Sequence, residues 1–236
     1  MKADVVQAKY RARTKPGNPN TRMDDAYRRI KQLIFEEKFV PGQKLVYDDL
    51  ARMLDMSRTP VINALNRLEQ QGLVLSESHR GFYVRPMDLG EAWDSFGVRE
   101  ALETYAVEQA ILKADEDDFK KLEEKRLDYD NYTPGYHDRK KIFMDASFHI
   151  QLAAMTKNKI LSWHLRINFE HLYLRAKLDN LDISRMKKES DEHHLLVKKM
   201  RNKDVAGSVE TIQAHIHAAR SSVMSCLSDH ELKGDK

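Results

Sequence analysis

Amphipathic helical spacing continues almost without interruption from residue 89 to residue 228, which restricts this region to an all-helical bundle. Only 9 glycines and 6 prolines occur among 236 residues, too few for the many tight turns of a β-sandwich or barrel. The loop YDNYTPGYHD is the clearest break in the pattern. Helices are expected over about 89–113, 116–130, 136–156, 158–180, 185–202 and 204–228.

Residues 23–86 have a different pattern, with three shorter helices followed by two strands. The helical stretches are DDAYRRIKQLIFEEK, VYDDLARMLDM and SRTPVINALNRLEQQGLV, and the strands LVLSE and GFYVRP flank the loop SHRG. Leu50, Met53 and Leu54 should face inward from the second helix. Three helices and a two-stranded wing form a winged helix-turn-helix, whose third helix enters the major groove of DNA. The predicted fold is therefore mostly α, with this N-terminal domain and a C-terminal helical bundle.

Charge and composition indicate where these domains end. Residues 1–22 hold six Lys/Arg and one acid without apolar periodicity, which predicts a disordered basic arm that either contacts phosphates or is only solvated. The winged helix-turn-helix is expected over 23–86, the helical domain over 89–229, and a disordered tail over 230–236. The single cysteine, Cys226, excludes an internal disulfide and fits a reducing cytosol. No apolar run approaches the roughly 18 residues of a membrane span, so a cytoplasmic protein without a membrane partner is expected.

The predicted third helix begins with residues suited to DNA. Arg58 and Thr59 would lie at its N-terminus, where base edges and phosphates are nearest, and arginine is the best donor to guanine or phosphate. Alternatively, Ser57, Arg58 and Thr59 only cap and solvate the helix. The longer string PGQKLVYDDLARMLDMSRTPVINALNRLEQQGLV, with RGFYV after it, resembles the DNA-binding domain of the GntR family of bacterial transcription regulators over about residues 24–85.

The resemblance implies a set of DNA-contacting residues and one departure. Family members touch DNA at the positions of Arg58, Thr59, His79, Arg80 and Gly81, and Ser57, Asn63 and Arg67 complete the predicted set. The family usually has Arg-Glu-Ala-Leu where this chain has Ile62-Asn63-Ala64-Leu65. Because asparagine can bond adenine with two hydrogen bonds, an altered operator sequence is expected.

Three predicted helices of the C-terminal region carry metal-ligating side chains on apolar faces. Asp145 and His149 lie four residues apart in KIFMDASFHIQLA, so their side chains share a face. His193 lies with Leu196, Val197 and Met200, and His215 with Ile212, while His194 and His217 point elsewhere. Singly, each histidine is better explained as a core residue bonded to a carbonyl. Together, three imidazoles and a carboxylate predict a site for a divalent ion, namely Zn, Ni, Fe or Mn. Because only neutral histidine binds metal, affinity should fall as pH drops through about 6.

The same region resembles the FCD ligand-binding domain, the all-helical C-terminal half of the FadR-type subfamily of GntR regulators. The strings VREALE, MDASFHIQLAAMTKNKIL and DEHHLLVKKMRNKDVAGSVETIQAHI carry the resemblance, over about residues 90–228. It implies that Asp145, His149, His193 and His215 hold a divalent cation and that a small organic acid completes its coordination. Members that bind long acyl-coenzyme A lack these ligands, so a fatty-acyl effector is not expected here.

Arg99 is the predicted clamp for the carboxylate of that acid, because guanidinium binds carboxylate with two parallel hydrogen bonds. The alternative for Arg99 is an exposed ion pair with Glu103. Asn168, Tyr173 and Arg175 are further candidates for the pocket wall.

These observations predict a ligand-responsive transcription regulator, expected to be a repressor, that binds a palindromic double-stranded operator as a homodimer. A metal-dependent hydrolase or lyase with a DNA-binding appendage is the rival, but the chain has no HExxH-type motif and no obvious general base beside the ligands. No enzymatic activity is therefore expected. A regulator whose metal is purely structural is the third possibility. The effector, the metal, the operator sequence and the direction of regulation stay open.

Overall fold

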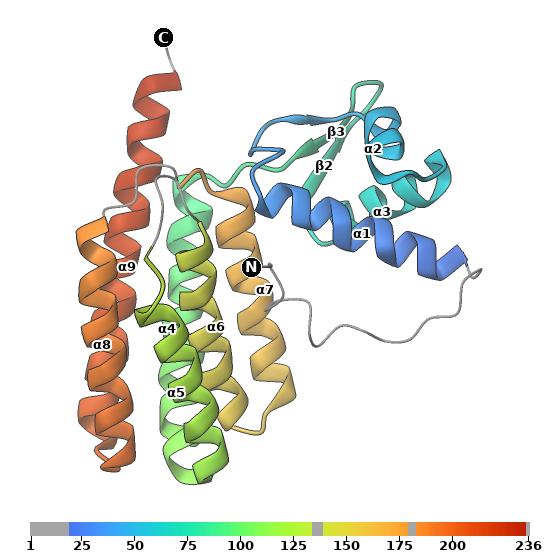
Figure 1. Ribbon diagram of the computed structural model, residues 1–236. Helices are drawn as coiled ribbons and strands as arrows, with labels where there is room; N and C mark the ends of the chain where they lie inside the picture. The colour runs from blue at the N-terminus through green and yellow to red at the C-terminus, as the bar shows by residue number, and fades with distance from the viewer. Residues whose placement is uncertain (1–18, 134–138, 179–182, 235–236) are drawn as a thin grey trace. The chain divides into compact units, whose positions relative to one another are not determined.

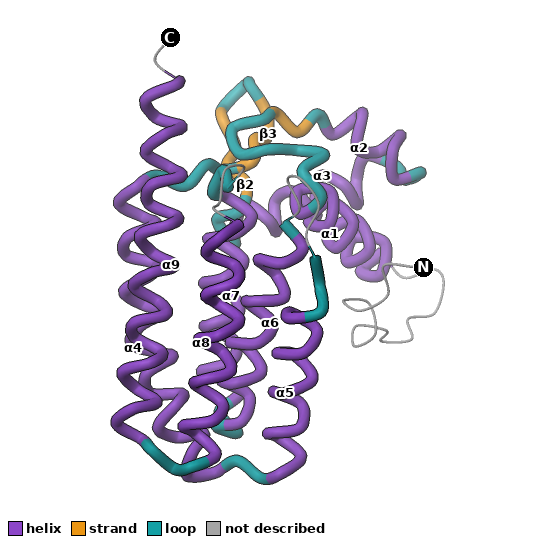
Figure 2. The backbone as a smooth tube through the Cα atoms, turned by 60° about the vertical axis from the view of Figure 1, so that its left-hand side comes forward, coloured by secondary structure: helices purple, strands orange, loops and turns teal. Residues whose placement is uncertain are grey.

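The computed structural model describes residues 19–133, 139–178 and 183–234, and helices predominate in these ranges (Figures 1 and 2). The chain divides into two compact units. Among the described residues, the N-terminal unit comprises 19–39 and 43–84, and the C-terminal unit comprises 40–42 and those from 85 to 234. The mostly helical fold predicted from the sequence is confirmed. No helix in the described part of the chain is long and apolar enough to cross a membrane.

The N-terminal unit is a winged helix-turn-helix. Helix α3 packs against α1 and α2, and a turn of three residues separates α2 from α3. Apolar side chains at helical spacing, including Ile30, Leu50, Val61, Leu65 and Leu68, are fully buried between these helices. The elements, in chain order, are α1 (Pro19–Phe35), β1 (Lys44–Leu45), α2 (Tyr47–Leu54), α3 (Arg58–Gln70), β2 (Val74–Glu77) and β3 (Gly81–Val84).

The wing contains a strand that the sequence did not predict. The sheet is antiparallel with the order β1-β3-β2, and Leu45 of β1 lies opposite Phe82 of β3. β1 has only two residues, which is too short to show the alternation of polar and apolar side chains that identifies a strand. The β2–β3 turn has His79 and Gly81 at positive φ, a conformation that glycine adopts without strain.

Two further expectations for this unit need correction. Met53 is 53% exposed instead of inward, because Leu50, Ala51 and Leu54 already fill the buried face of α2. Helix α1 begins at Pro19, so residues 19–22, assigned to the disordered arm, belong to a helix, and the rest of that arm lies outside the described residues.

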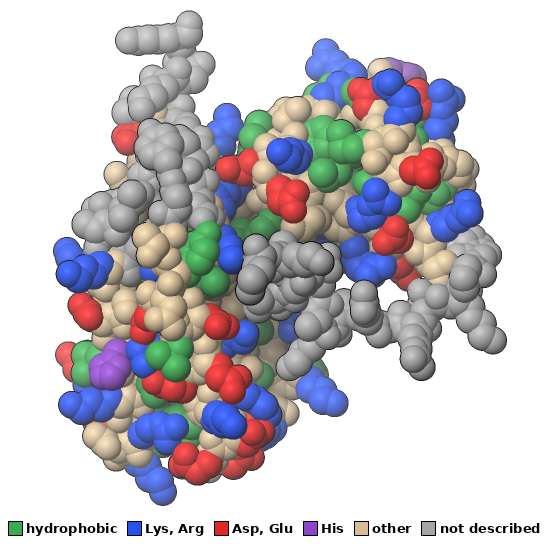
Figure 3. Space-filling model, in the orientation of Figure 1, with side chains coloured by type: hydrophobic (Ala, Val, Ile, Leu, Met, Phe, Trp, Pro, Cys, Tyr) green, Lys and Arg blue, Asp and Glu red, His purple; other side chains and the backbone are tan. Residues whose placement is uncertain are grey.

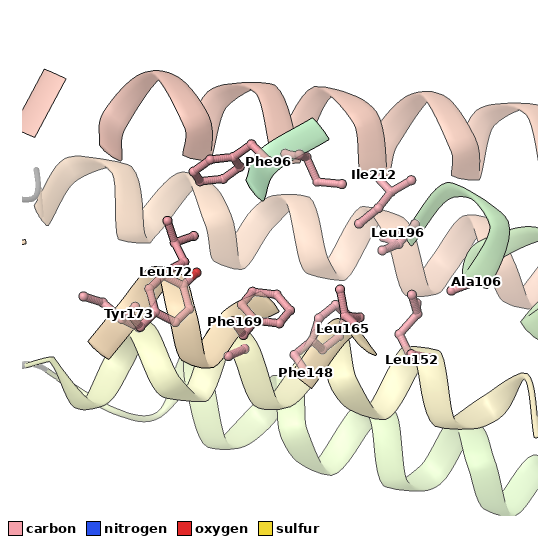
Figure 4. Close-up of a cluster of buried hydrophobic side chains, with 14 of the residues drawn as sticks. Phe96, Ala106, Phe148, Leu152, Leu165, Phe169, Leu172, Tyr173, Leu196 and Ile212 are labelled. Carbon is pink, nitrogen blue, oxygen red and sulfur yellow. The ribbon is translucent and has the colours of Figure 1, made fainter. Parts of the chain in front are cut away.

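The C-terminal unit is a bundle of long helices that lie side by side in both views (Figures 1 and 2). α4 packs against α9, α6 and α7, and α8 packs against α9 and α5. The helices are α4 (Leu89–Lys113), α5 (Glu116–Asp130), α6 (Lys140–Met155), α7 (Lys159–Arg175), α8 (Ile183–Arg201) and α9 (Val205–Gly234). Phe148, Leu165, Phe169 and Ile212 point into the space between the helices (Figure 4).

Two helix ends differ from the prediction. α7 stops at Arg175 instead of 180, because Arg139 donates hydrogen bonds to the carbonyls of Tyr173 and Ala176 and so satisfies groups that the last turn leaves unpaired. α9 continues to Gly234, so residues 230–234, assigned to a disordered tail, are helical. Residues 136–138, 179–180 and 235–236 lie outside the described residues.

Candidate metal centre and DNA-reading surface

Four potential metal ligands converge inside the bundle from three helices. α6 supplies Asp145 and His149, α8 supplies His193, and α9 supplies His215. All four side chains are buried, and their ligand atoms lie within 4.8 Å of one another. The i, i+4 spacing on α6 places two ligands one above the other, and the apolar stripes of α8 and α9 turn the two later histidines toward them.

The separations of the ligand atoms fit a common ion. Oδ1 of Asp145 lies 3.3 Å from Nε2 of His149, 3.2 Å from Nε2 of His193 and 3.7 Å from Nε2 of His215. The Nε2 atoms of His149 and His215 are 3.0 Å apart. Ligand atoms about 2.1 Å from one ion lie roughly 3.0–3.4 Å from each other in octahedral or tetrahedral geometry. The cluster therefore has the dimensions of a metal site.

Unsatisfied polar atoms at the centre also fit a cation. Oδ1 of Asp145 and both ring nitrogens of His193 are buried without an aligned hydrogen bond, although Oδ1 and Nε2 lie 3.2 Å apart. Burying such groups unpaired is unfavourable, and native proteins satisfy nearly all of them. A divalent ion bound to these atoms would compensate the carboxylate and use the lone pairs. The ligand set of three nitrogens and one oxygen suits Zn, Ni, Fe or Mn.

Two carboxylates that the sequence did not predict stand behind the histidines. Oε2 of Glu192 lies 2.7 Å from Nδ1 of His215, and Arg185 binds Glu192 through two nitrogens at 2.5 and 2.6 Å. Oε2 of Glu103 lies 2.5 Å from Nδ1 of His149, while Oε1 of Glu103 accepts a hydrogen bond from Arg99. The sequence indicates Glu103 only as a surface partner of Arg99. Its neighbours on the same face of α4 are apolar, Ala106 three residues later and Val107 four residues later, and they were the available sign that Glu103 is buried.

These contacts divide the histidines into two kinds. Burial alone would lower the pKa of His149, but the charges of Glu103 and Asp145 outweigh it and raise the pKa to about 9. Burial lowers the pKa of His193 to about 3 and also lowers the pKa of His215. Burial would raise the pKa of Glu103, but His149 and Arg99 lower it to about 2. The cluster thus has one cationic histidine at neutral pH and two neutral ones.

Arg99 lies in the interior of the bundle, so its reading as an exposed ion pair is wrong. The side chain is 0% exposed, its Nε donates to Glu103, and its guanidinium carbon lies 4.3 Å from the centre of the Phe169 ring. Its two terminal nitrogens are buried without a hydrogen-bond partner. A guanidinium edge with unused donors is the group that binds a carboxylate with two parallel hydrogen bonds.

The three other predicted pocket residues are placed differently from one another. The hydroxyl of Tyr173 donates to Oδ2 of Asp145 at 3.3 Å, which brings it to the cluster. Asn168 donates instead to the backbone oxygen of Ser95. Arg175 has other partners. Among the described residues its side chain bonds to Pro86 O, Glu91 and His171, and none of these bonds goes to the cluster.

The two remaining histidines of these helices face away from the cluster. His194 is exposed, and His217 is exposed and pairs with Glu100 at 2.9 Å. The choice of helix faces made from the apolar stripes therefore agrees with the geometry.

The start of α3 and the wing present the residues predicted to meet DNA. Lys and Arg side chains recur over the face of this unit seen in Figure 3, among acidic ones. Ser57 occupies the N-cap position of α3 without a side-chain cap hydrogen bond, so its expected role as a cap is not seen. Gly81 is partly buried at the base of the wing turn. The exposed members of the predicted set are Ser57, Arg58, Thr59, Asn63, His79 and Arg80.

Two arginines of this surface are already paired. Nε of Arg58 lies 2.5 Å from Asp48, at the edge of an open groove of about 1220 Å³ lined by α1, α2 and the start of α3. Arg67 pairs with Asp24 at 2.6 Å and lies over the ring of Tyr27. Because both partners of Arg67 belong to α1, this side chain holds α3 to α1.

A DNA-reading winged helix followed by a helical bundle with a buried cluster of ligating side chains defines a two-part, DNA-binding regulator. Residues 22–84 match the model of bacterial regulatory proteins of the gntR family, and residues 94–218 match that of the FCD domain. The chain belongs to the GntR family of bacterial transcription regulators and carries an FCD domain.

Relatives agree with this family. The chain is 26% identical over 199 residues to the uncharacterized HTH-type transcriptional regulator YdhC of Bacillus subtilis, covering 81% of this chain and 86% of that protein. It is 27% identical over 223 residues to the Uxu operon transcriptional regulator of Escherichia coli, covering 83% and 84%. The structure of E. coli McbR/YncC shares the fold, with a TM-score of 0.71 at 18% identity, covering 86% of this chain and 97% of that one.

Proposed function

We propose that this protein is a ligand-responsive repressor of the FadR type, whose affinity for its operator is set by a small organic acid bound at a divalent metal in the C-terminal unit. The observation that carries the proposal is the buried cluster of Asp145 and three histidines, together with the unused guanidinium edge of Arg99. A metal that only stabilises the fold would not account for that edge.

Charge balance supports an anionic ligand. A divalent ion would take the place of the proton on His149. Asp145 and Glu103 then contribute two negative charges, while Arg99 and the ion contribute three positive ones. Glu192 and Arg185 cancel each other, and Glu189, whose pKa is raised to about 7 by burial and by Asp145, is counted as protonated. One buried positive charge is left, and uncompensated buried charge is unfavourable. A monocarboxylate would neutralise it, and four protein ligands leave positions on an octahedral ion for its oxygens.

A physical route from the cluster to the chain segment that joins the two units supports a ligand response. Tyr173 of α7 bonds to Asp145, and two residues later Arg175 bonds to the backbone oxygen of Pro86 and to Glu91. The backbone N–H of Met87 donates to the backbone oxygen of Arg175 at 3.1 Å. A displacement of α7 by a bound acid would thus reach residues 86–91 directly.

The proposed DNA contacts are those of the exposed start of α3 and of the wing. A two-fold protein matches a two-fold site, so we infer a homodimer on a palindromic operator, acting in the cytoplasm where the chromosome lies. The acid weakens or tightens DNA binding according to which conformation of the protein, DNA-binding or non-binding, it binds with higher affinity. An acid that bound both conformations equally would not shift the equilibrium between them.

Calorimetry and operator titration together test this function. Small mono- and dicarboxylates and sugar acids would be titrated into protein loaded with a divalent ion, and any binder would be added to an operator titration. We expect a binder to change operator affinity by about 1–3 kcal/mol, the usual range of allosteric coupling. A binder that stabilises the protein but leaves operator affinity unchanged would make the metal site structural only.

A further inference from the structure

Two of the cluster histidines have the same kind of neighbour at Nδ1, the ring nitrogen that faces away from the centre of the cluster. Behind two of the three histidines stands a glutamate, and behind each glutamate stands an arginine. We propose that Glu192 and Glu103 are positioning residues, which fix the rings of His215 and His149 so that each presents Nε2 to the metal. The inference rests on the proposed metal site and adds residues to it.

The support of His215 by Glu192 is fully formed. Nδ1 of His215 and Oε2 of Glu192 are 2.7 Å apart, and the two oxygens of Glu192 accept hydrogen bonds from Arg185 at 2.5 and 2.6 Å. A carboxylate held in this forked geometry has a fixed direction. Glu192 directly precedes the ligand His193 on α8. The same turn of α8 therefore supplies one metal ligand and also the residue that supports His215, a ligand from α9.

The support of His149 by Glu103 is completely buried. Glu103 and His149 are both 0% exposed, and Oε2 of Glu103 lies 2.5 Å from Nδ1 of His149 at ion-pair distance, without an aligned hydrogen bond. Oε1 of Glu103 accepts from Nε of Arg99 at 2.9 Å. Arg99 therefore uses one donor to hold Glu103 and keeps its terminal nitrogens for another acceptor.

The chemistry of imidazole explains why a carboxylate at Nδ1 matters. A neutral ring has one N–H, and the other nitrogen holds the lone pair that binds a metal. A carboxylate at Nδ1 keeps the hydrogen there, which leaves Nε2 as the ligand, and such partners typically change metal affinity about 10–100-fold. His193 has no such partner among the described residues. The ring of His193 stacks on that of Phe148, with 4.1 Å between the ring centres, and packs edge-on against that of Tyr129, with 5.3 Å between the ring centres.

The test compares Glu192→Ala and Glu103→Gln with Glu100→Ala. Glu192→Ala is suited to folding because Arg185 keeps Glu189 at 3.4 Å. Glu103→Gln keeps an oxygen for Arg99 but places its NH2 group, which cannot accept a hydrogen bond, at Nδ1 of His149. Glu100 is a matched control, since it pairs with a histidine of α9 from α4 but at the surface. Zinc affinity would be measured by chelator competition, and the ring tautomers of the zinc-loaded protein by nitrogen-15 NMR of histidine.

We expect Glu192→Ala and Glu103→Gln to lose about 10–100-fold in zinc affinity, and Glu100→Ala to match the wild type. The Nδ1-protonated signal of His215 should weaken in Glu192→Ala, and Glu192→Gln should restore part of the affinity because its amide oxygen still accepts. If Glu103→Gln does not fold, the Glu192 variants decide the question alone.

Two different failures can be told apart. Should Glu192→Ala and Glu103→Gln keep wild-type affinity and tautomers while His215→Ala loses zinc, the positioning role is refuted and the metal site stands. Should His193→Ala and His215→Ala also keep their zinc, the proposed metal site itself is refuted.

Discussion

His149 holds a proton at neutral pH in the place where the proposed metal would bind. Burial would lower its pKa, but Glu103 and Asp145 raise it to about 9, whereas the pKa of His193 is lowered to about 3. A group with a raised pKa keeps its proton below that pH, so metal must displace one proton at any pH under about 9. The sequence alone, with ordinary histidines, had suggested a change near 6.

The expected result is that metal affinity rises about tenfold per pH unit from pH 6 to pH 8, with about one proton released per ion bound. Calorimetry of zinc binding in buffers of different protonation enthalpy measures that proton count. Affinity that is flat over this range, with no proton released, would mean that His149 is neutral or is not a ligand.

Arg99 is expected to affect stability as well as acid binding. Arg99→Ala would remove the buried guanidinium that pairs with Glu103, and breaking a buried ion pair costs about 3–5 kcal/mol. Arg99→Lys keeps the charge but loses the forked donors, so it should fold and bind metal while binding the acid more weakly. Urea unfolding and calorimetry would measure both effects, with Arg201→Lys at the surface as the control. Undiminished acid affinity in Arg99→Lys would remove Arg99 from the effector site.

The two arginines of α3 should behave differently on DNA. Arg58 is exposed at the helix start, and Arg58→Ala should reduce specific operator binding by about 1–3 kcal/mol, the value of a good base contact. Arg67 is held on α1 by Asp24 and Tyr27, so Arg67→Ala should mainly lower stability. Band-shift titrations at fixed salt, with thermal melts, separate the two. Wild-type binding by Arg58→Ala would mean that α3 does not read the operator.

At the scale of elements, α7 is the helix that the proposed response depends on. Its last turn touches Asp145 through Tyr173 and the 86–91 segment through Arg175. Glu91→Gln weakens the pairing with Arg85 and Arg175 and leaves the cluster intact. We expect unchanged acid affinity in the absence of DNA, with most of the roughly 1–3 kcal/mol of coupling to the operator lost. Glu116→Gln, in an exposed pair with Arg201, is the control. Full coupling in Glu91→Gln would exclude this route.

The helices that could be predicted from the sequence are those whose own residues form an apolar stripe along one face. The stripes of α6, α8 and α9 gave both the helices and the faces that carry the four ligands. The end of α7 could not be predicted, because Arg139, 36 residues earlier, satisfies its last carbonyls. Glu103 and Glu192 were missed for a related reason. Local spacing makes each look like an ordinary charged side chain of a helix, and only packing against other helices makes them partners of His149 and His215.

At the scale of the whole molecule, membership of the GntR family identifies the protein as a transcription regulator. The cluster in the C-terminal unit is the basis of our proposal for how it is controlled. A polar cluster in the core of a bundle is unfavourable unless something compensates it. A divalent ion compensates Asp145 and, by joining three helices, makes metal binding part of folding. The open coordination positions and Arg99 then sense the acid.

Elemental analysis of purified protein is the most direct test of the metal. The wild type should contain about one divalent ion per chain, and His193→Ala and His215→Ala should lose most of it, because four ligands would become three. His194→Ala and His217→Ala, changed on the exposed faces of the same two helices, should keep their metal. Equal metal content in all five proteins, or loss only in His194→Ala and His217→Ala, would contradict the account.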